Sequence, residues 1–283
     1  MKTNRLLIAS ITLTAVAAMV FTGCKKDEED ADTSAASDNA LAEATFSDVT
    51  NIADEAGISG SLSNYRLGDP DNGGVLSTCA TLTFDTLNSA DQDTITIDFG
   101  PVNCTCNDGR NRRGQVIVIY QGMYRDSNST HTITFNNYYV NDNQVLGTKT
   151  VTNLGHNTAG NLVYDINVNG TIHLANNQGT ITWTSQRQRE WIAGESTMVW
   201  YDDMYSITGT ASGTSAAGEA FTVNITSPLI RNMAIGCRRH FTQGIVEVTP
   251  GTRPMRTIDF GSGACDDLAT VTINNRSYVI HLR

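Results

Sequence analysis

The 283-residue sequence contains none of the short motifs that mark the commonest catalytic and nucleotide-binding sites. It lacks G-x-S-x-G, which exposes a serine nucleophile, and H-E-x-x-H, which places two zinc ligands on one helix. The P-loop and the glycine-rich dinucleotide fingerprint are absent too, and the five histidines are scattered without metal-ligand spacing. These absences argue against the enzyme classes built on those motifs and favour a protein without catalytic activity.

Basic residues are scarce as well. The chain has 19 lysines and arginines against 29 aspartates and glutamates, which gives a formal net charge of −10. Removal of a leader containing Lys2 and Arg5 leaves 17 basic residues against the same 29 acidic ones, a charge of −12. Proteins that bind nucleic acids need clustered positive charge to displace the counterions of the phosphate backbone. Nucleic acid is therefore excluded as an expected partner.

The apolar stretch Leu6–Phe21 follows a basic start and is shorter than the roughly 20 residues that a bilayer-spanning helix requires, so it predicts an export signal. It ends in FTGC, whose last residue is Cys24. This pattern resembles the lipobox of bacterial lipoproteins. The resemblance implies a signal peptide over residues 1–23, lipidation of Cys24 and attachment to the membrane through that lipid. The alternative is an ordinary signal peptide that contains a cysteine.

The stretch after Cys24 is charged and of low complexity. It reads KKDEED from Lys25 to Asp30 and continues as ADTSAASDNALAEA, a composition typical of a flexible linker. We expect residues 24–44 to form an acidic tether. A lysine-then-acidic run behind a lipidated cysteine resembles the surface-export signal of some Gram-negative lipoproteins, so we expect an outer-membrane protein displayed on the cell surface. The periplasmic face of that membrane is the alternative location.

Residues 45–283 are expected to form a single large β domain. Apolar residues at three- and four-residue spacing before Gly57 predict a short helix over about 46–56. From about residue 75 to the end, apolar and polar residues alternate with period two, as in TITIDF and GTITWTS. No second long helical pattern occurs, which argues against parallel βαβ architecture. We predict an all-β fold, a long antiparallel meander folded as a sandwich or flattened open barrel, with the helix covering an open end.

Turn-forming dipeptides separate the strand-like runs. Asparagine and glycine tolerate positive φ, which two-residue hairpin turns require. We therefore expect such turns at Asn169-Gly170, Gln178-Gly179 and Asn274-Asn275.

A strand-and-cysteine phrase occurs twice: TIDFGPVNC ends at Cys104 and TIDFGSGAC ends at Cys265, and each follows an earlier cysteine. Because an exported compartment permits disulfides, we predict that Cys237 pairs with Cys265, and Cys79 with either Cys104 or Cys106. The remaining thiol is then free or pairs between chains. No cluster of histidines and cysteines accompanies Cys104-Thr-Cys106, so no metal is expected there.

Several aspartates are candidates for ligands or catalytic groups. Asp98 and Asp259 occupy equivalent places in the two phrases, and paired carboxylates can act as acid and base. We expect them to be solvated or turn-bonding instead, and we expect turn bonds for Asp108, Asp266 and Asp267 as well. The loop GDPDNGG, Gly68–Gly74, partly resembles a calcium loop but lacks its later ligands. We expect no cofactor, with calcium at this loop as the alternative.

All three tryptophans fall within TWTSQRQREWIAGESTMVWYDDMY, interleaved with arginines and tyrosines. Trp, Tyr and Arg are the residues most enriched at binding hot spots, so this cluster is the candidate site for a glycan or a protein partner. The alternative is cross-strand aromatic packing, in which the tryptophans are buried. The candidate residues are Trp183, Arg187, Arg189, Trp191, Trp200, Tyr201 and Tyr205.

The lipobox, the acidic tether and the stretches TFNNYYVN, VLGTKTVTN and YSITGTASG together resemble uncharacterised β-rich envelope lipoproteins of Gram-negative bacteria. The resemblance implies export and a β fold but brings no activity or catalytic residue. We expect a lipid-anchored envelope lipoprotein that binds a glycan or a protein. Two alternatives stay open: a structural lipoprotein without a ligand site, and an enzyme that acts on polysaccharide.

Overall fold

The computed structural model describes residues 30–59, 76, 79–85, 93–122, 126–197, 199 and 201–282. Cys24 with the export signal, the Gly68–Gly74 loop and Trp200 lie outside these residues. The chain from Ala31 onward forms one structural unit. Within the described residues, no helix combines the length and the apolar character needed to cross a membrane.

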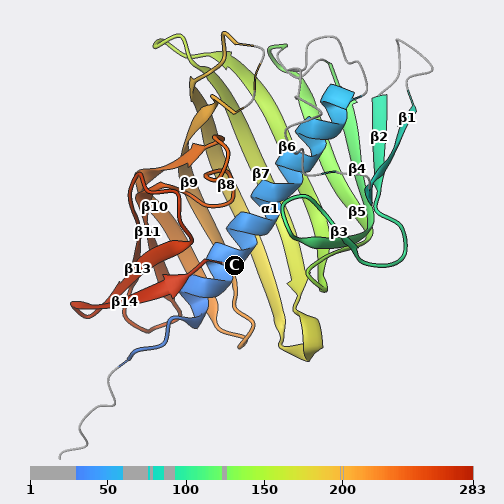
Figure 1. Cartoon of the computed structure of the whole chain (residues 1–283). Helices are drawn as coiled ribbons and strands as arrows, with labels where there is room; N and C mark the ends of the chain where they lie inside the picture. The colour runs from blue at the N-terminus through green and yellow to red at the C-terminus, as the bar shows by residue number, and fades with distance from the viewer. Residues whose placement is uncertain are drawn as a thin grey trace, which may run out of the picture. The chain divides into compact units, whose positions relative to one another are not determined.

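The described chain folds into one antiparallel sheet of 14 strands, ordered β1-β2-β4 and then consecutively to β14, with β3 paired to β4 beside this path. The sheet is open, with β1 and β14 at its edges, and it curves around one long helix (Figure 1). The predicted all-β meander with an N-terminal helix is confirmed, as one open sheet. Its strands are β1 Thr81–Asp85, β2 Asp93–Asp98, β3 Cys104–Thr105, β4 Asn111–Gln121, β5 Thr130–Val140, β6 Asn143–His156, β7 Leu162–His173, β8 Thr180–Ala193, β9 Met204–Thr214, β10 Ala220–Asn232, β11 Gln243–Pro250, β12 Arg256–Ser262, β13 Leu268–Ile273 and β14 Arg276–His281.

The helix α1, Ser34–Ser59, is longer than predicted, with 26 residues. The expectation of a flexible tether up to residue 44 and of a domain starting at 45 was therefore wrong for residues 34–44. Alanine is the best helix former, and Ala35, Ala36 and Ala42 of this segment are buried. The Ser34 N–H donates to Asp32 Oδ1 at 2.8 Å, which satisfies one of the free N–H groups at the helix start.

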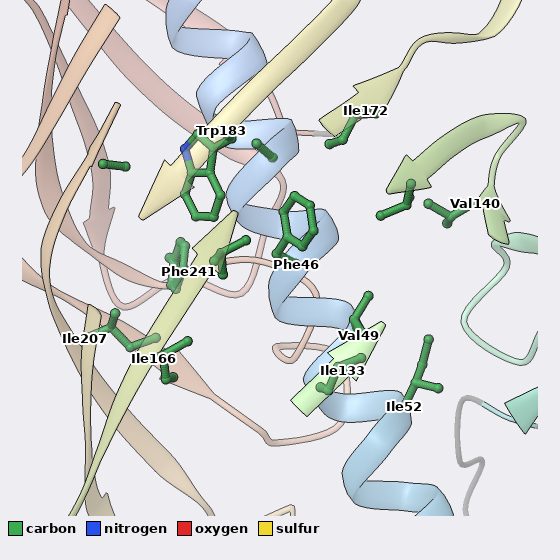
Figure 2. Close-up of a cluster of buried hydrophobic side chains, with 14 of the residues drawn as sticks. Phe46, Val49, Ile52, Ile133, Val140, Ile166, Ile172, Trp183, Ile207 and Phe241 are labelled. Carbon is green, nitrogen blue, oxygen red and sulfur yellow. The ribbon is translucent and has the colours of Figure 1, made fainter. Parts of the chain in front are cut away.

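From the sequence, the helix was expected to cover an open end of the sheet. Instead it lies along the inner face of the sheet, in contact with β2, β4, β5, β8 and β11. We call the face of the sheet whose side chains are buried the inner face, and the opposite face of the sheet the outer face. Figure 2 shows Phe46 and Val49 of α1 among sheet residues such as Ile133 and Trp183. Full burial of such a side chain contributes about 1.5–3 kcal/mol, so the core holds α1 against the sheet.

The turns follow the sequence in part. Asn274-Asn275 joins β13 to β14 with φ of 49° and 65°, as predicted for a two-residue hairpin. Gln178-Gly179 ends a longer connection that includes the 3-10 turn η2, Ala175–Asn177. The turn predicted at Asn169-Gly170 was wrong, because both residues lie inside β7. Gly170 is needed there because a Cβ at this position would lie 2.0 Å from Cζ of Phe46.

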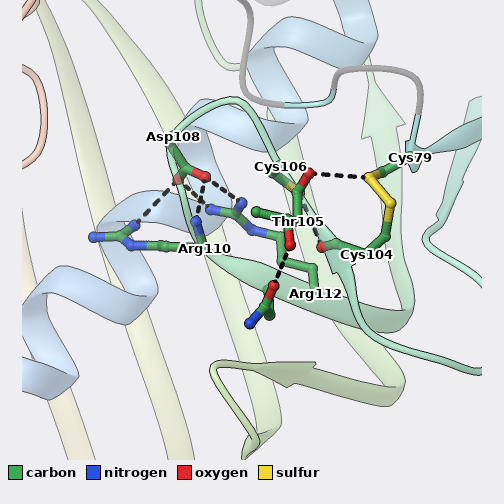
Figure 3. The surroundings of a disulfide bond; sticks show 8 residues. Cys79, Cys104, Thr105, Cys106, Asp108, Arg110 and Arg112 are labelled. Atoms are coloured by element: carbon green, nitrogen blue, oxygen red, sulfur yellow. Dashed lines mark hydrogen bonds and ion pairs between the residues drawn. A yellow bond between two sulfur atoms is a disulfide. The ribbon is translucent and has the colours of Figure 1, made fainter.

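Two disulfides are present, Cys79–Cys104 and Cys237–Cys265, with sequence separations of 25 and 28 residues. Both predicted bridges are confirmed, and Cys104 rather than Cys106 is the partner of Cys79. Cys106 is a free, buried thiol beside the first bridge (Figure 3). Closing loops of this length stabilises the fold by about 3 kcal/mol each in the chain-entropy picture.

Candidate functional site

The predicted aromatic and arginine cluster lies beneath α1, on the inner face of β8 and β9. Trp183 and Trp191 are only 2% and 3% exposed. Trp183 Nε1 donates to Asn39 Oδ1 at 3.0 Å, and its ring stacks on Phe46 with centroids 5.8 Å apart. Trp183 therefore packs against the chain's own helix, and the burial of both tryptophans fits the alternative of aromatic packing rather than an exposed ligand groove.

The arginines of the cluster are buried with them. Arg187 Nη2 donates to Glu43 Oε2 at 2.7 Å, which makes an ion pair between β8 and α1. The Arg189 guanidinium lies over the rings of Tyr164 and Tyr205, 4.8 and 4.7 Å from their centroids. Cations in such positions are stabilised by aromatic faces once they are removed from water.

The end of the cluster near β9 is organised by Asp203. This buried carboxylate accepts hydrogen bonds from Trp191 Nε1 at 3.2 Å and from the Tyr205 hydroxyl at 3.1 Å. Tyr201 is 40% exposed. Of the seven candidate residues, five are thus buried, one lies at the surface and Trp200 is outside the described residues.

A second group of ionisable side chains, Lys149 of β6 and Asp54 of α1, was missed from the sequence. Lys149 Nζ donates to the Phe46 carbonyl at 2.8 Å, and burial lowers the pKa of Lys149 to about 7. Burial raises the pKa of Asp54 to about 6, although the charges of Arg189 and Lys149 act to lower it. The sequence alternation of β6 could have revealed Lys149, because it places this residue on the same inward face as Val145 and Val151.

An ionic cluster lies at the β3–β4 turn, and Figure 3 shows its members Asp108, Arg110 and Arg112. Arg112 is fully buried and donates to both oxygens of Asp108, at 2.8 and 2.7 Å, and to Asp48 Oδ2 of α1 at 2.7 Å. Arg110 pairs with Asp48 at 2.7 Å. Two carboxylates thus balance two arginines, which is the condition under which buried charges are tolerated.

The aspartates of the repeated phrase take part in turns, as expected. Asp98 accepts the N–H of Gly100 at 2.7 Å, and Asp259 accepts that of Gly261 at 2.8 Å. Hydrogen bonds from Gln115 and from the Gly100 N–H lower the pKa of Asp98, so this carboxylate is a poor proton donor. Across the described part of the chain, no three His, Cys, Asp or Glu side chains are grouped to hold a metal ion.

The outer face of β8–β11 carries a groove of about 440 Å³, which we call the outer groove. Strand register aligns its polar side chains into two rows that cross four strands. Adjacent strands are 4.7–4.9 Å apart, so hydrogen-bonding groups recur at that interval along each row. One row is Thr184, Ser212, Thr222 and Thr249, and the other is Gln186, Thr210, Asn224 and Glu247.

Comparison of the chain with family models, with curated proteins and with solved structures found no match. A fold hosts many functions, and so the function must be inferred from the chemistry of the two faces of the sheet. The inner face is occupied by α1, whereas the outer groove is accessible.

Proposed function

We propose that this protein is a lipid-anchored binding module of the cell envelope that holds a neutral glycan chain in the outer groove. The observation that carries the proposal is the pair of polar rows across β8–β11. Their hydroxyl and amide groups can donate and accept hydrogen bonds, as glycan hydroxyls do. The recurrence of these groups at the strand spacing suits an extended polymer of repeating units better than a compact ligand.

The charge of the groove selects among glycans. Glu247 is the one ionisable residue among those lining it, and no lysine or arginine is included. The chain as a whole carries a formal charge of −10. Sulfated and phosphorylated polymers are repelled by such a surface, so a neutral polysaccharide is the expected ligand class.

The proposal is tested by affinity electrophoresis of the full-length chain, in which binding slows migration through gels that contain soluble β-glucan, mannan or galactan. Heparin is the anionic comparison. The groove variant is Thr222→Val with Thr249→Val, a cross-strand pair on β10 and β11. The control is Thr134→Val with Thr148→Val, a cross-strand pair on β5 and β6 outside the groove. Each lost hydrogen bond is worth about 0.5–1.5 kcal/mol, so the groove variant should bind about tenfold more weakly.

Equal retention of the groove variant and the control variant would contradict the outer groove as the site. Absence of binding to every neutral polymer would favour the structural alternative, an envelope lipoprotein without a ligand site. The burial of Trp183 and Trp191 is the observation that supports this second candidate, because the aromatic residues then serve the core.

The proposed lipid anchor at Cys24 and the display of the protein on the cell surface are tested separately. The FTGC and KKDEED stretches support lipidation of Cys24 and surface display. Cys24→Ala should release the protein from the membrane fraction, and protease added to intact cells should remove the wild-type protein while sparing a periplasmic control. Survival of the protein with an intact outer membrane would favour the periplasmic face.

A further inference from the structure

A small cavity of about 20 Å³ lies between α1 and the strands β10–β12. A cavity of this size holds about one particle as large as a water molecule. Most of its wall is apolar, with Leu229, Val246 and Phe260 among the lining residues. Its polar wall consists of Asn39, Glu43, Arg231, Arg239 and His240.

Arg231 is the buried charge at this cavity. Its side chain is only 6% exposed, and its guanidinium lies 4.5 Å from the centroid of the Phe241 ring. Nη1 donates to the carbonyl oxygens of Arg238 at 2.8 Å and Arg239 at 3.5 Å, whereas the buried Nε has no acceptor. Within the described part of the chain, no carboxylate forms an ion pair with Arg231. Carbonyl oxygens accept its hydrogen bonds but do not cancel its charge.

The charges around the cavity leave a positive excess. Burial lowers the pKa of Arg231 to about 10, so the group still carries its proton at neutral pH. Glu43 also lines the cavity, but its carboxylate is bonded to Arg187 at 2.7 Å. Exposed Arg239 adds a second positive charge at the rim. A buried charge without a counter-ion is costly, and an anion in the cavity would remove that cost.

We propose that the cavity beside Arg231 is a binding site for a small inorganic anion of the size of chloride. The volume admits a monatomic ion and excludes a polyatomic anion such as gluconate. The apolar wall lowers the local dielectric constant and strengthens the attraction between the anion and the guanidinium. The Cys237–Cys265 disulfide tethers the segment whose carbonyl groups hold Arg231, so the site is built into the fold. It is separate from the outer groove.

The first test uses the full-length wild-type chain in sodium chloride and in sodium gluconate at equal ionic strength. Chloride should raise Tm in a saturable way, since a ligand that binds only the folded state stabilises it. The ³⁵Cl NMR line should broaden on addition of protein and narrow again on addition of bromide. An identical Tm in both salts, together with an unbroadened line, would overturn the proposal and leave a site for water only.

Variants locate the site. Arg239→Gln at the exposed rim should fold normally and weaken chloride binding about tenfold, which corresponds to one lost charge interaction. Arg231→Gln should abolish the line broadening and make Tm independent of chloride. Arg276→Gln, an exposed arginine on β14, is the control and should bind as the wild type does. If Arg231→Gln fails to fold, Arg239→Gln decides: an unchanged chloride affinity in that variant would refute the assignment.

Discussion

The contact between Gly170 of β7 and Phe46 of α1 provides the sharpest test of how the helix docks. A Cβ on Gly170 would lie 2.0, 2.5 and 2.8 Å from three atoms of the Phe46 ring. The φ of Gly170 lies outside the left-handed region, so its backbone accepts alanine without strain. The Phe46 ring is confined by Trp183, stacked at 5.8 Å, and by Phe135 at 6.2 Å, and it cannot swing away easily.

Gly170→Ala should therefore destabilise the protein by overpacking, at about 1–3 kcal/mol. Phe46→Ala alone should cost about 3–5 kcal/mol, as other large core truncations do. In the double variant the added methyl group fills part of the space that the ring has left. The double variant should thus be no less stable than Phe46→Ala, which makes the coupling energy about 1–3 kcal/mol.

The free energy of unfolding is measured in urea by tryptophan fluorescence, which reports on Trp183 beside Phe46. Gly213→Ala in β9 is the matched control, because its Cβ would meet first the Thr182 carbonyl oxygen at 2.0 Å and Cζ of Phe221 at 3.0 Å rather than Phe46. Phe46→Ala should not rescue that variant. If Gly170→Ala is as stable as the wild type, or its cost simply adds to that of Phe46→Ala, the docking of α1 on β7 is wrong.

Three further predictions follow from buried groups. Because burial lowers the pKa of Lys149 from 10.5 to about 7, wild-type stability should rise between pH 7 and 10 by at most about 1.4 kcal/mol per pH unit. Lys149→Met should remove that rise in urea melts at pH 7 and 9.5, and a flat wild-type profile would contradict it. Asp108→Ala should lower the free energy of unfolding by about 3–5 kcal/mol, because buried Arg112 loses a partner. Asp142→Ala breaks the exposed pair with Arg113 and should cost less than about 1 kcal/mol. Equal losses of stability in the two variants would refute this distinction between buried and exposed pairs. Cys106 should resist thiol reagents until urea unfolds the chain, and non-reducing peptide maps should join Cys79 to Cys104 and never to Cys106.

Features that depend on neighbours in the sequence were predictable. The period-two alternation of β8 places every second side chain from Ile181 to Trp191 on one face, as the structure has it. The Asn274-Asn275 turn and the turn bonds of Asp98 and Asp259 are likewise decided within a few residues. Local backbone preferences and hydrogen bonds determine these features, so a short window of sequence contains the information.

The full length of α1 was also encoded but was hidden by composition. Residues 34–45 read SAASDNALAEAT, which is typical of a linker, yet the buried positions follow alternating four- and three-residue steps through the whole helix. Small alanines in those steps bury little area by themselves and give a weak apolar pattern. The positions in this series are Ala35, Asn39, Ala42, Phe46, Val49, Ala53 and Ala56.

By itself, the sequence determined the antiparallel strands, the alternation of their two faces, the two cysteine pairs to within one alternative, and the Asn274-Asn275 turn. Only the tertiary structure decided which face α1 covers, and hence that Trp183 and Arg187 bind the helix while the outer face of β8–β11 stays accessible. The physical reason is that alternation assigns residues to a face but does not say what packs on it. That choice depends on contacts between residues more than 100 positions apart, such as Phe46 with Gly170.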